Sequence, residues 1–183
     1  EGGIGGGSEG GGVPGAVAKR WQKGGMEVRV LSGERDLWQV ADEDIKLRIR
    51  KTSRGLTEVH HYYPQDVEQE YQVTPKEFID VKALMGDASD NIPGVPSIGQ
   101  KTATSLIVQF HSLENLYAHL DEVKPPRAKK ALEENRELAK LAYTLAKICT
   151  EAPVEFTAAD AKAGDLFTPE AYELVKQLGF KSI

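Results

Sequence analysis

The chain has 183 residues, of which 40% are hydrophobic and 28% charged, and its formal net charge is −5 at pH 7. These proportions are ordinary for a soluble globular protein with one domain or two small ones. The acidic balance argues against nucleic-acid binding through overall charge. A basic surface that binds nucleic acid would therefore have to be a local one.

The sequence carries no targeting or membrane signal. No apolar run reaches the roughly 18 residues that a membrane helix needs, and no signal peptide is visible. The single cysteine, Cys149, cannot form an internal disulfide, which fits a reducing compartment. Its apolar neighbours Leu145 and Ile148 predict a buried structural thiol. We therefore expect a cytoplasmic protein that meets no membrane and associates with the nucleoid only through DNA.

Residues 1–15 hold nine of the eighteen glycines of the chain. Such a stretch gains little to offset its backbone entropy, so it predicts a linker-like lead. Residues 16–25 follow as a short predicted helix that ends at two glycines.

A small α/β unit is predicted over residues 16–66. Residues 26–33 are rich in β-branched side chains and predict a strand. Residues 44–50 alternate apolar and basic side chains, and residues 56–63 can pair with them in an antiparallel hairpin.

Beyond this unit, residues 67–183 predict helices only. Thr74 fits an N-cap and Pro75 a first helical position, and Ser112 and Thr168 fit the N-caps of two later helices. Helical stretches are expected at 64–71, 74–86, 100–110, 112–120, 125–148 and 168–179. The longest of these is expected to bury one side made of Leu138, Leu141, Leu145 and Ile148. The helix at 100–110 is expected to carry an apolar stripe at i, i+3, i+4 and i+7, made of Ala103, Leu106, Ile107 and Phe110.

Residues 86–103, GDASDNIPGVPSIGQKTA, form a glycine- and proline-rich turn that opens into a helix. Gly94 and Gly99 are expected to adopt backbone angles closed to other residues. The free N–H groups and the dipole of the helix start, with Lys101 and Thr102 beside them, suit a phosphate oxygen. The alternative is an ordinary αα-hairpin in which the glycines only allow close packing.

Two acidic pairs follow predicted elements. Asp87 and Asp90 come just after a predicted helix end, and Glu34 and Asp36 come directly after a predicted strand. Either pair alone fits a cap or a solvated loop. If both pairs converge, their carboxylates suit a hard cation such as Mg²⁺.

Four stretches of the chain together resemble one family: SGERDLWQ, KTSRGLTEV, YQVTPKEFIDVKALMGDASDNIPGVPSIGQKTA and SLENLY. They are similar to the C-terminal half of the 5′-nuclease domain of bacterial DNA polymerase I, in the flap-endonuclease family. The resemblance runs from about residue 16 to the C-terminus. It implies a fragment of a PIN-like α/β core, followed by an all-helical region with a helix–hairpin–helix (H3TH) motif. It also implies cleavage of 5′ flaps and 5′ ends of DNA, in replication and repair, with two Mg²⁺ or Mn²⁺ ions.

The resemblance also assigns residues. Asp87 and Asp90 match metal ligands of the family, as do Asp36 and, with a longer side chain, Glu34. Glu9 matches the first residue of a further ligand motif. The hairpin that grips duplex DNA is matched by Gly94, Val95, Ile98, Gly99, Lys101 and Thr102. Related hairpins also hold a K⁺ ion through backbone carbonyls.

The chain departs from the family pattern near its start. Two aspartates of the further ligand motif are replaced by Gly11 and Gly12, and Pro14 is expected to interrupt the helix that normally follows. The N-terminal half of the family domain has no counterpart in the sequence. The resemblance therefore implies a missing N-terminal nuclease segment or a following polymerase domain as partners.

Two functions stand side by side at this point. The first is the DNA-binding C-terminal part of a metal-dependent 5′-3′ exonuclease or flap endonuclease, with an incomplete two-ion site and weak activity of its own. The second is a module that binds duplex or 5′-flap DNA without catalysis.

Overall fold

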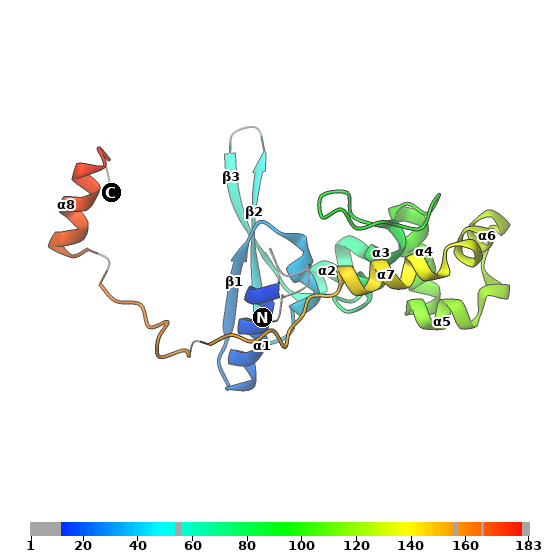
Figure 1. The fold of residues 1–183 in the computed structure, drawn as a ribbon, viewed down its shortest axis with the longest axis horizontal. Helices are drawn as coiled ribbons and strands as arrows, with labels where there is room; N and C mark the ends of the chain where they lie inside the picture. Colours follow the sequence, from blue (N-terminus) through cyan, green and yellow to red (C-terminus); the bar gives the residue numbers. More distant parts are fainter. Residues whose placement is uncertain (1–11, 54–55, 156, 166, 181–183) are drawn as a thin grey trace, which may run out of the picture.

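The structure, a computed structural model, describes residues 12–53, 56–155, 157–165 and 167–180 (Figure 1). Within these ranges no helix combines the length and the apolar character needed to cross a membrane. The elements, in chain order, are α1 (Gly12–Lys23), β1 (Val28–Ser32), the 3-10 helix η1 (Arg35–Val40), β2 (Ile45–Ser53), β3 (Leu56–Tyr62), α2 (Pro64–Tyr71), α3 (Glu77–Met85), α4 (Gln100–Phe110), α5 (Leu113–Ala118), the 3-10 helix η2 (Leu120–Glu122), α6 (Pro126–Glu134), α7 (Arg136–Ala146) and α8 (Pro169–Gln177).

A small mixed sheet in the order β1-β2-β3 forms the α/β part of the chain. β1 runs parallel to β2, with Val28 opposite Ile45, and β3 returns antiparallel, with Tyr62 opposite Leu47. The predicted hairpin is confirmed: Ile45 and Leu47 are buried, and Lys46 between them points to a more open face. α1 packs against β1, and the helices from α3 to α7 lie together on one side of the sheet (Figure 1).

The glycine-rich lead is shorter than the sequence predicted, because α1 begins at Gly12 and runs through Pro14. Proline is tolerated in the first turn of a helix, where its missing N–H breaks no intrahelical bond, so the expected interruption at Pro14 is wrong. Gly15 belongs to the packing, since a Cβ there would lie 2.8 Å from Cγ2 of Ile148. The assignment of residues 12–15 to a linker is therefore wrong. Residues 1–11, which include Glu9, lie outside the described residues.

Three aromatic side chains connect the α/β part to the helices. Trp38 in η1 is fully buried, and its ring centroid lies 5.1 Å from that of Tyr71 in α2 and 5.5 Å from that of Phe78 in α3. Tyr71 and Phe78 meet edge to face at 4.9 Å. Such tilted contacts are the favoured arrangement of aromatic pairs, so they fix η1 against the start of α3.

α3 is the central helix of the helical region and packs on both α4 and α7. All its side chains from 78 to 84 are buried, including the charged residues Asp80 and Lys82. Buried charges require partners, and each of these two has them. Asp80 holds a neighbouring helix, as described below, and Lys82 faces the acidic loop.

Helix starts follow the predicted capping residues. α3 begins at Glu77 rather than at Pro75, yet Oγ1 of Thr74 accepts a bond from the Glu77 N–H, and the Glu77 carboxylate accepts one from the Thr74 N–H. Ser112 caps α5 and Thr168 caps α8, each accepting from a backbone N–H three residues on.

The apolar stripe predicted for the helix after the loop is confirmed. It faces the core from α4 and consists of Ala103, Leu106, Ile107 and Phe110, all buried.

The predicted helix over residues 125–148 is two helices, α6 and α7, separated at Asn135. Its predicted buried side is wrong at two of four positions, because Leu141 and Leu145 are 51% and 37% exposed, whereas Ile148 is buried and Leu138 is half-buried. The buried side of α7 is made of Ala139, Ala142 and Ala146. Small side chains allow α7 to lie close to α3, so the leucines are turned away from the contact.

Cys149 is exposed, so the predicted buried thiol is wrong. Its neighbour Ile148 is buried, and the chain after α7 runs along the surface with one side inward. Apolar sequence neighbours therefore do not fix the direction of a side chain outside a helix or strand. α8 lies beyond the sheet, away from the other helices (Figure 1).

Asp80 ties α3 to α5. Its buried Oδ1 accepts the Leu113 N–H at 2.8 Å, which satisfies a donor at the start of α5. Burial raises the pKa of the Asp80 carboxyl to about 6, although the bond from Leu113 acts in the opposite direction. The folded chain therefore holds this proton more tightly than the unfolded chain does.

The Asp80 proton predicts a pH dependence of stability. Protonation favours the folded state below about pH 4, and this contribution is lost as pH rises from about 4 to 6, by up to about 3 kcal/mol. Asp80→Asn keeps the acceptor for Leu113 and removes the titration. Urea unfolding at pH 4 to 7.5 should show Asp80→Asn more stable than the unchanged chain at pH 7 and no more stable at pH 4. A constant difference across this range would contradict the assignment.

Candidate metal centre and nucleic-acid interface

The acidic loop after α3 is closed on itself by two backbone bonds. The Asp87 N–H donates to the Ile92 carbonyl at 2.9 Å, and the Ile92 N–H donates to the Asp87 carbonyl at 2.8 Å. Within the loop, Oδ1 of Asp87 accepts the Ser89 N–H at 2.9 Å. These bonds hold Asp87 and Asp90 on one short turn, so their carboxylates are placed by the backbone.

Two glycines allow the return of this loop onto the end of α3. Gly86 has a φ of 74°, which other residues rarely adopt. Gly94 needs its missing side chain for space, since a Cβ there would lie 2.4 Å from the carbonyl carbon of Met85. The Val95 N–H then donates to the Leu84 carbonyl at 2.8 Å.

The prediction of unusual backbone angles at Gly94 and Gly99 is wrong. Neither has a positive φ, and Gly99 lies at a φ of −91° with nothing within 4 Å of a Cβ. The left-handed positions of the loop belong instead to Asn91 and Ser97, with φ of 54° and 68°. Gly99 is therefore not required by the chain itself, and open space surrounds it.

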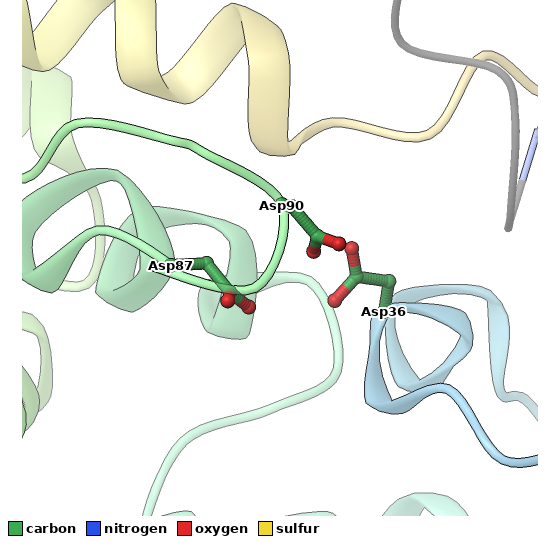
Figure 2. Close-up of side chains that lie close together, drawn as sticks. All are labelled: Asp36, Asp87 and Asp90. Carbon is green, nitrogen blue, oxygen red and sulfur yellow. The ribbon is translucent and has the colours of Figure 1, made fainter.

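Asp36 joins the acidic loop from the other part of the fold. It lies in the first turn of η1, directly after β1, and its carboxylate faces that of Asp90 (Figure 2). Gln39 fixes η1 from behind, because its side chain donates to the Ala146 carbonyl at 3.0 Å and accepts the Ile148 N–H at 2.8 Å. The second half of η1 is thus held against the end of α7.

The two predicted acidic pairs converge in part. Asp36, Asp87 and Asp90 each offer a carboxylate oxygen, and these oxygens lie within 4.8 Å of one another. Glu34 is at the exposed start of η1 and does not belong to this group. Glu9 is outside the described residues.

Lys82 is the residue that sequence reasoning missed. Its side chain is 2% exposed, and its Nζ lies 2.8 Å from Asp87 Oδ2, 3.4 Å from Asp90 Oδ2 and in direct contact with Asp36 Oδ1. The sequence held one indication of this role, which is a single lysine inside the largely apolar run FIDVKALM. A helix with so many apolar residues is buried on most sides, so its lysine is buried too. A buried ammonium needs anionic partners, and these are the three carboxylates.

The charges of the cluster shift one another. Burial and the neighbouring carboxyl of Asp90 raise the pKa of Asp36, and together they outweigh its contact with Lys82, which lowers it. Burial alone would raise the pKa of Asp87, but the bonds from Lys82 and Ser89 outweigh it and lower that pKa to about 2. Burial would lower the pKa of Lys82, and its bonds to Asp36 and Asp87 outweigh that and raise it. Lys82 is therefore charged at neutral pH.

The second half of the loop leads into the free N-terminus of α4. The first bond of this helix runs from the Ala103 N–H to the Gly99 carbonyl, so the N–H groups of residues 100–102 precede it and point outward. Lys101 is exposed beside them, and Thr102 is half-buried. The helix start thus offers donors, a positive dipole end and a mobile cation together.

The other predicted hairpin residues lie differently. Val95 and Ile98 are buried, and their N–H groups already donate to the carbonyls of Leu84 and Val95. They shape the turn from inside. Among the predicted DNA-binding residues, Gly99, Lys101 and Thr102 are those at the open start of α4.

A family model described as "5'-3' exonuclease, C-terminal SAM fold" matches residues 73–167, more than half of the chain. The chain belongs to this family.

Relatives within the wider group are DNA polymerases. DNA polymerase I of Bacillus caldotenax is 42% identical over 170 residues, and that of Bacillus subtilis (strain 168) is 40% identical over 171 residues. Each match covers 93% of this chain and 19% of the relative, so the chain spans about a fifth of the length of these proteins.

The fold is that of 5′-exonucleases. The structure of a bacteriophage T5 flap endonuclease, solved as a complex with DNA and metal ions, superposes with a TM-score of 0.65 at 22% identity. The match covers 75% of this chain and 49% of that one. The predicted fold class, a PIN-like α/β fragment followed by a helical region, is confirmed.

In a 5′-3′ exonuclease family member, the acidic cluster fits a hard divalent cation. All three donors are carboxylate oxygens, which Mg²⁺ and Mn²⁺ prefer, and the backbone places them before a metal arrives. The Lys82 ammonium is the feature of the cluster that opposes a cation, because it neutralises part of the same negative charge.

A methyl group should destabilise the chain far more at Gly94 than at Gly99. Gly94→Ala drives a Cβ into the backbone at Met85 and should cost more than about 3 kcal/mol of unfolding free energy. Gly99→Ala meets open space at an N-cap position and should cost about 1 kcal/mol at most. Urea unfolding of both variants measures the difference, and equal losses would contradict the packing described for Gly94.

Proposed function

We propose that this chain is the DNA-gripping and metal-holding part of a 5′-3′ exonuclease of the flap-endonuclease type, acting on duplex or 5′-flapped DNA with Mg²⁺ or Mn²⁺. One observation carries this proposal. A single loop, residues 86–99, carries two of the three carboxylates of the acidic cluster and leads directly into the open N-terminus of α4. A phosphodiester bound at α4 therefore lies on the same rigid turn as the carboxylates.

The three carboxylates of the cluster are the proposed metal ligands. Asp36, Asp87 and Asp90 would hold the divalent ion. Such an ion lowers the pKa of an attacking water and neutralises charge on the phosphate. The loop bonds between Asp87 and Ile92 keep two of the ligands in register without metal, so the backbone of the loop need not reorder when an ion binds.

The start of α4 would hold the DNA backbone. N–H groups at residues 100–102 and the Lys101 ammonium position a phosphate without reading bases. Arg127 from α6 lies close by, with its guanidinium 3.2 Å from Ser97 Oγ in the same turn. Backbone carbonyls of the turn would hold a K⁺ ion that bridges to the phosphate, as the resemblance implies.

The comparisons support this proposal through related proteins. The T5 flap endonuclease was solved with DNA and metal ions, and the Bacillus relatives are DNA polymerases I. We infer that full activity uses further carboxylates from a preceding nuclease segment and that a polymerase domain belongs to the whole protein. The match to only 19% of each relative supports this inference.

A non-catalytic duplex-binding module is the second candidate, and Lys82 favours it. An ammonium inside the ligand set lowers the net negative charge available to a metal. The DNA grip at α4 does not depend on that charge, so a chain without catalysis would still bind DNA.

DNA binding should depend on close approach at Gly99 more than on a single charge. A side chain in Gly99→Val stands between the phosphate and the helix start while the fold is kept, whereas Lys101→Ala removes one screened cation. Gel shifts with a 5′-flap duplex should show the larger loss for Gly99→Val and a log–log salt slope of about −3 for the unchanged chain.

Gly164→Val is the matched control, because Gly164 also has open space around it and lies far along the chain from the hairpin. Equal affinities of Gly99→Val and Gly164→Val, or strong sequence preference, would refute the hairpin grip.

Cleavage by this chain alone should be near background with Mg²⁺ or Mn²⁺. The described cluster contributes three carboxylates and one ammonium, which is less charge than a two-ion site needs. A fluorescent 5′-flap assay, with Asp87→Ala as the control, measures it. Robust metal-dependent cleavage that Asp87→Ala abolishes would show that the three carboxylates suffice. Cleavage regained only when the N-terminal nuclease segment of a Bacillus relative is added would support the proposed completion of the site.

A further inference from the structure

We propose that Lys82 is an internal counter-cation, which keeps the three carboxylates assembled without metal and with which a divalent ion must compete. This inference rests on the proposed metal centre and adds to it a residue that sets metal affinity. Lys82 would act through the three carboxylates, by holding them together and by opposing the metal ion, so it is a positioning residue.

The position of the ammonium is the first step. Lys82 Nζ contacts a carboxylate of each of the three acidic residues, with 2.8 Å to Asp87 and 3.4 Å to Asp90. Its side chain is 2% exposed, so water cannot replace these partners. The side chain leaves α3 inside a stretch in which every side chain from 78 to 84 is buried.

The second step is the charge of the cluster. Three carboxylates whose oxygens lie within 4.8 Å repel one another strongly in a partly buried place. One ammonium at their centre removes a third of this charge and supplies a donor to each. The loop and η1 come from different parts of the fold, so Lys82 is also the cation that connects them.

The third step is competition. A divalent ion on the same oxygens would lie within about 5 Å of Nζ, and a unit charge at that distance, even at the dielectric constant of water, changes its affinity by more than about tenfold. Because both cations use the same oxygens, the ion must displace the ammonium from the oxygens that it binds. Lys82 thereby lowers metal affinity while it raises metal-free stability.

Calorimetry with Mn²⁺ separates these effects. Lys82→Met keeps an unbranched side chain that is one atom shorter and removes its charge, and it should bind Mn²⁺ at least about tenfold more tightly than the unchanged chain. Lys140→Met is the matched control: it removes the same charge from an exposed lysine whose partner is Glu137, and it should leave Mn²⁺ affinity unchanged. Lys82→Gln is measured alongside, and it decides the affinity if Lys82→Met does not fold.

A second measurement needs no metal. In EDTA, Lys82→Met leaves three carboxylates that repel one another without a cation between them. Removing the charge of one carboxylate should therefore stabilise the folded state of this variant. Asp36→Asn should raise the Tm of the Lys82→Met chain by about 3 °C or more relative to its effect in the unchanged chain. Lys82→Gln again serves as the background if Lys82→Met is unfolded.

The outcomes distinguish this inference from the proposed function. Tighter Mn²⁺ binding by the Lys82 variants, with the coupling to Asp36, supports it. Mn²⁺ binding that is equal or weaker in the Lys82 variants overturns it and leaves the proposed metal centre intact. If no chain binds Mn²⁺, the proposed metal centre fails together with the competition. In that case the Tm coupling between Lys82 and Asp36 in EDTA tests the counter-cation role by itself. If this coupling is absent, the counter-cation role is overturned as well.

Discussion

The buried ammonium of Lys82 is the contact on which the arrangement of the site depends. It links Asp36, which follows β1, to Asp87 and Asp90, which follow α3, so it connects the α/β part of the fold to the helical part. Gln39 and the aromatic group of Trp38, Tyr71 and Phe78 reinforce the same junction with hydrogen bonds and packing. Among these contacts, the Lys82 bonds are those a metal ion would directly rearrange, because they use the oxygens that the metal needs.

The loop after α3 explains how the proposed metal and DNA sites become neighbours in this chain. The backbone turns back on itself at Gly86 and Gly94, where a side chain at Gly94 would collide with Met85. This close return places the acidic turn and the start of α4 a few residues apart on one rigid piece. Val95 and Ile98 fill the turn from inside, while Gly99 leaves the outside open. Phosphate and metal would thus be positioned because their binding residues lie close together in the chain on one loop, rather than by a movable lid.

Local patterns of the sequence predicted much of this, and tertiary contacts decided the rest. The stripe on α4, the caps at Ser112 and Thr168 and the β2–β3 hairpin follow from periodicity and capping chemistry, which are local. The role of Lys82 was not predictable in this way, because nearly every side chain of α3 is buried and no polar face separates it from its neighbours. The leucines of α7 misled for a similar reason: close packing on α3 selected its alanines. Gly94 was singled out for its backbone angle, whereas its actual constraint is a contact with a residue before the loop.

A divalent ion and the Lys82 ammonium would compete for the same carboxylate oxygens. Anomalous diffraction from crystals of this chain grown with Mn²⁺ can test this competition, since it locates the metal and the side chain in one experiment. We expect an anomalous peak bound by Asp36, Asp87 and Asp90, with Nζ of Lys82 moved off their oxygens. A peak elsewhere in the chain, or a peak at these carboxylates with Lys82 still bonded to all three, would contradict it.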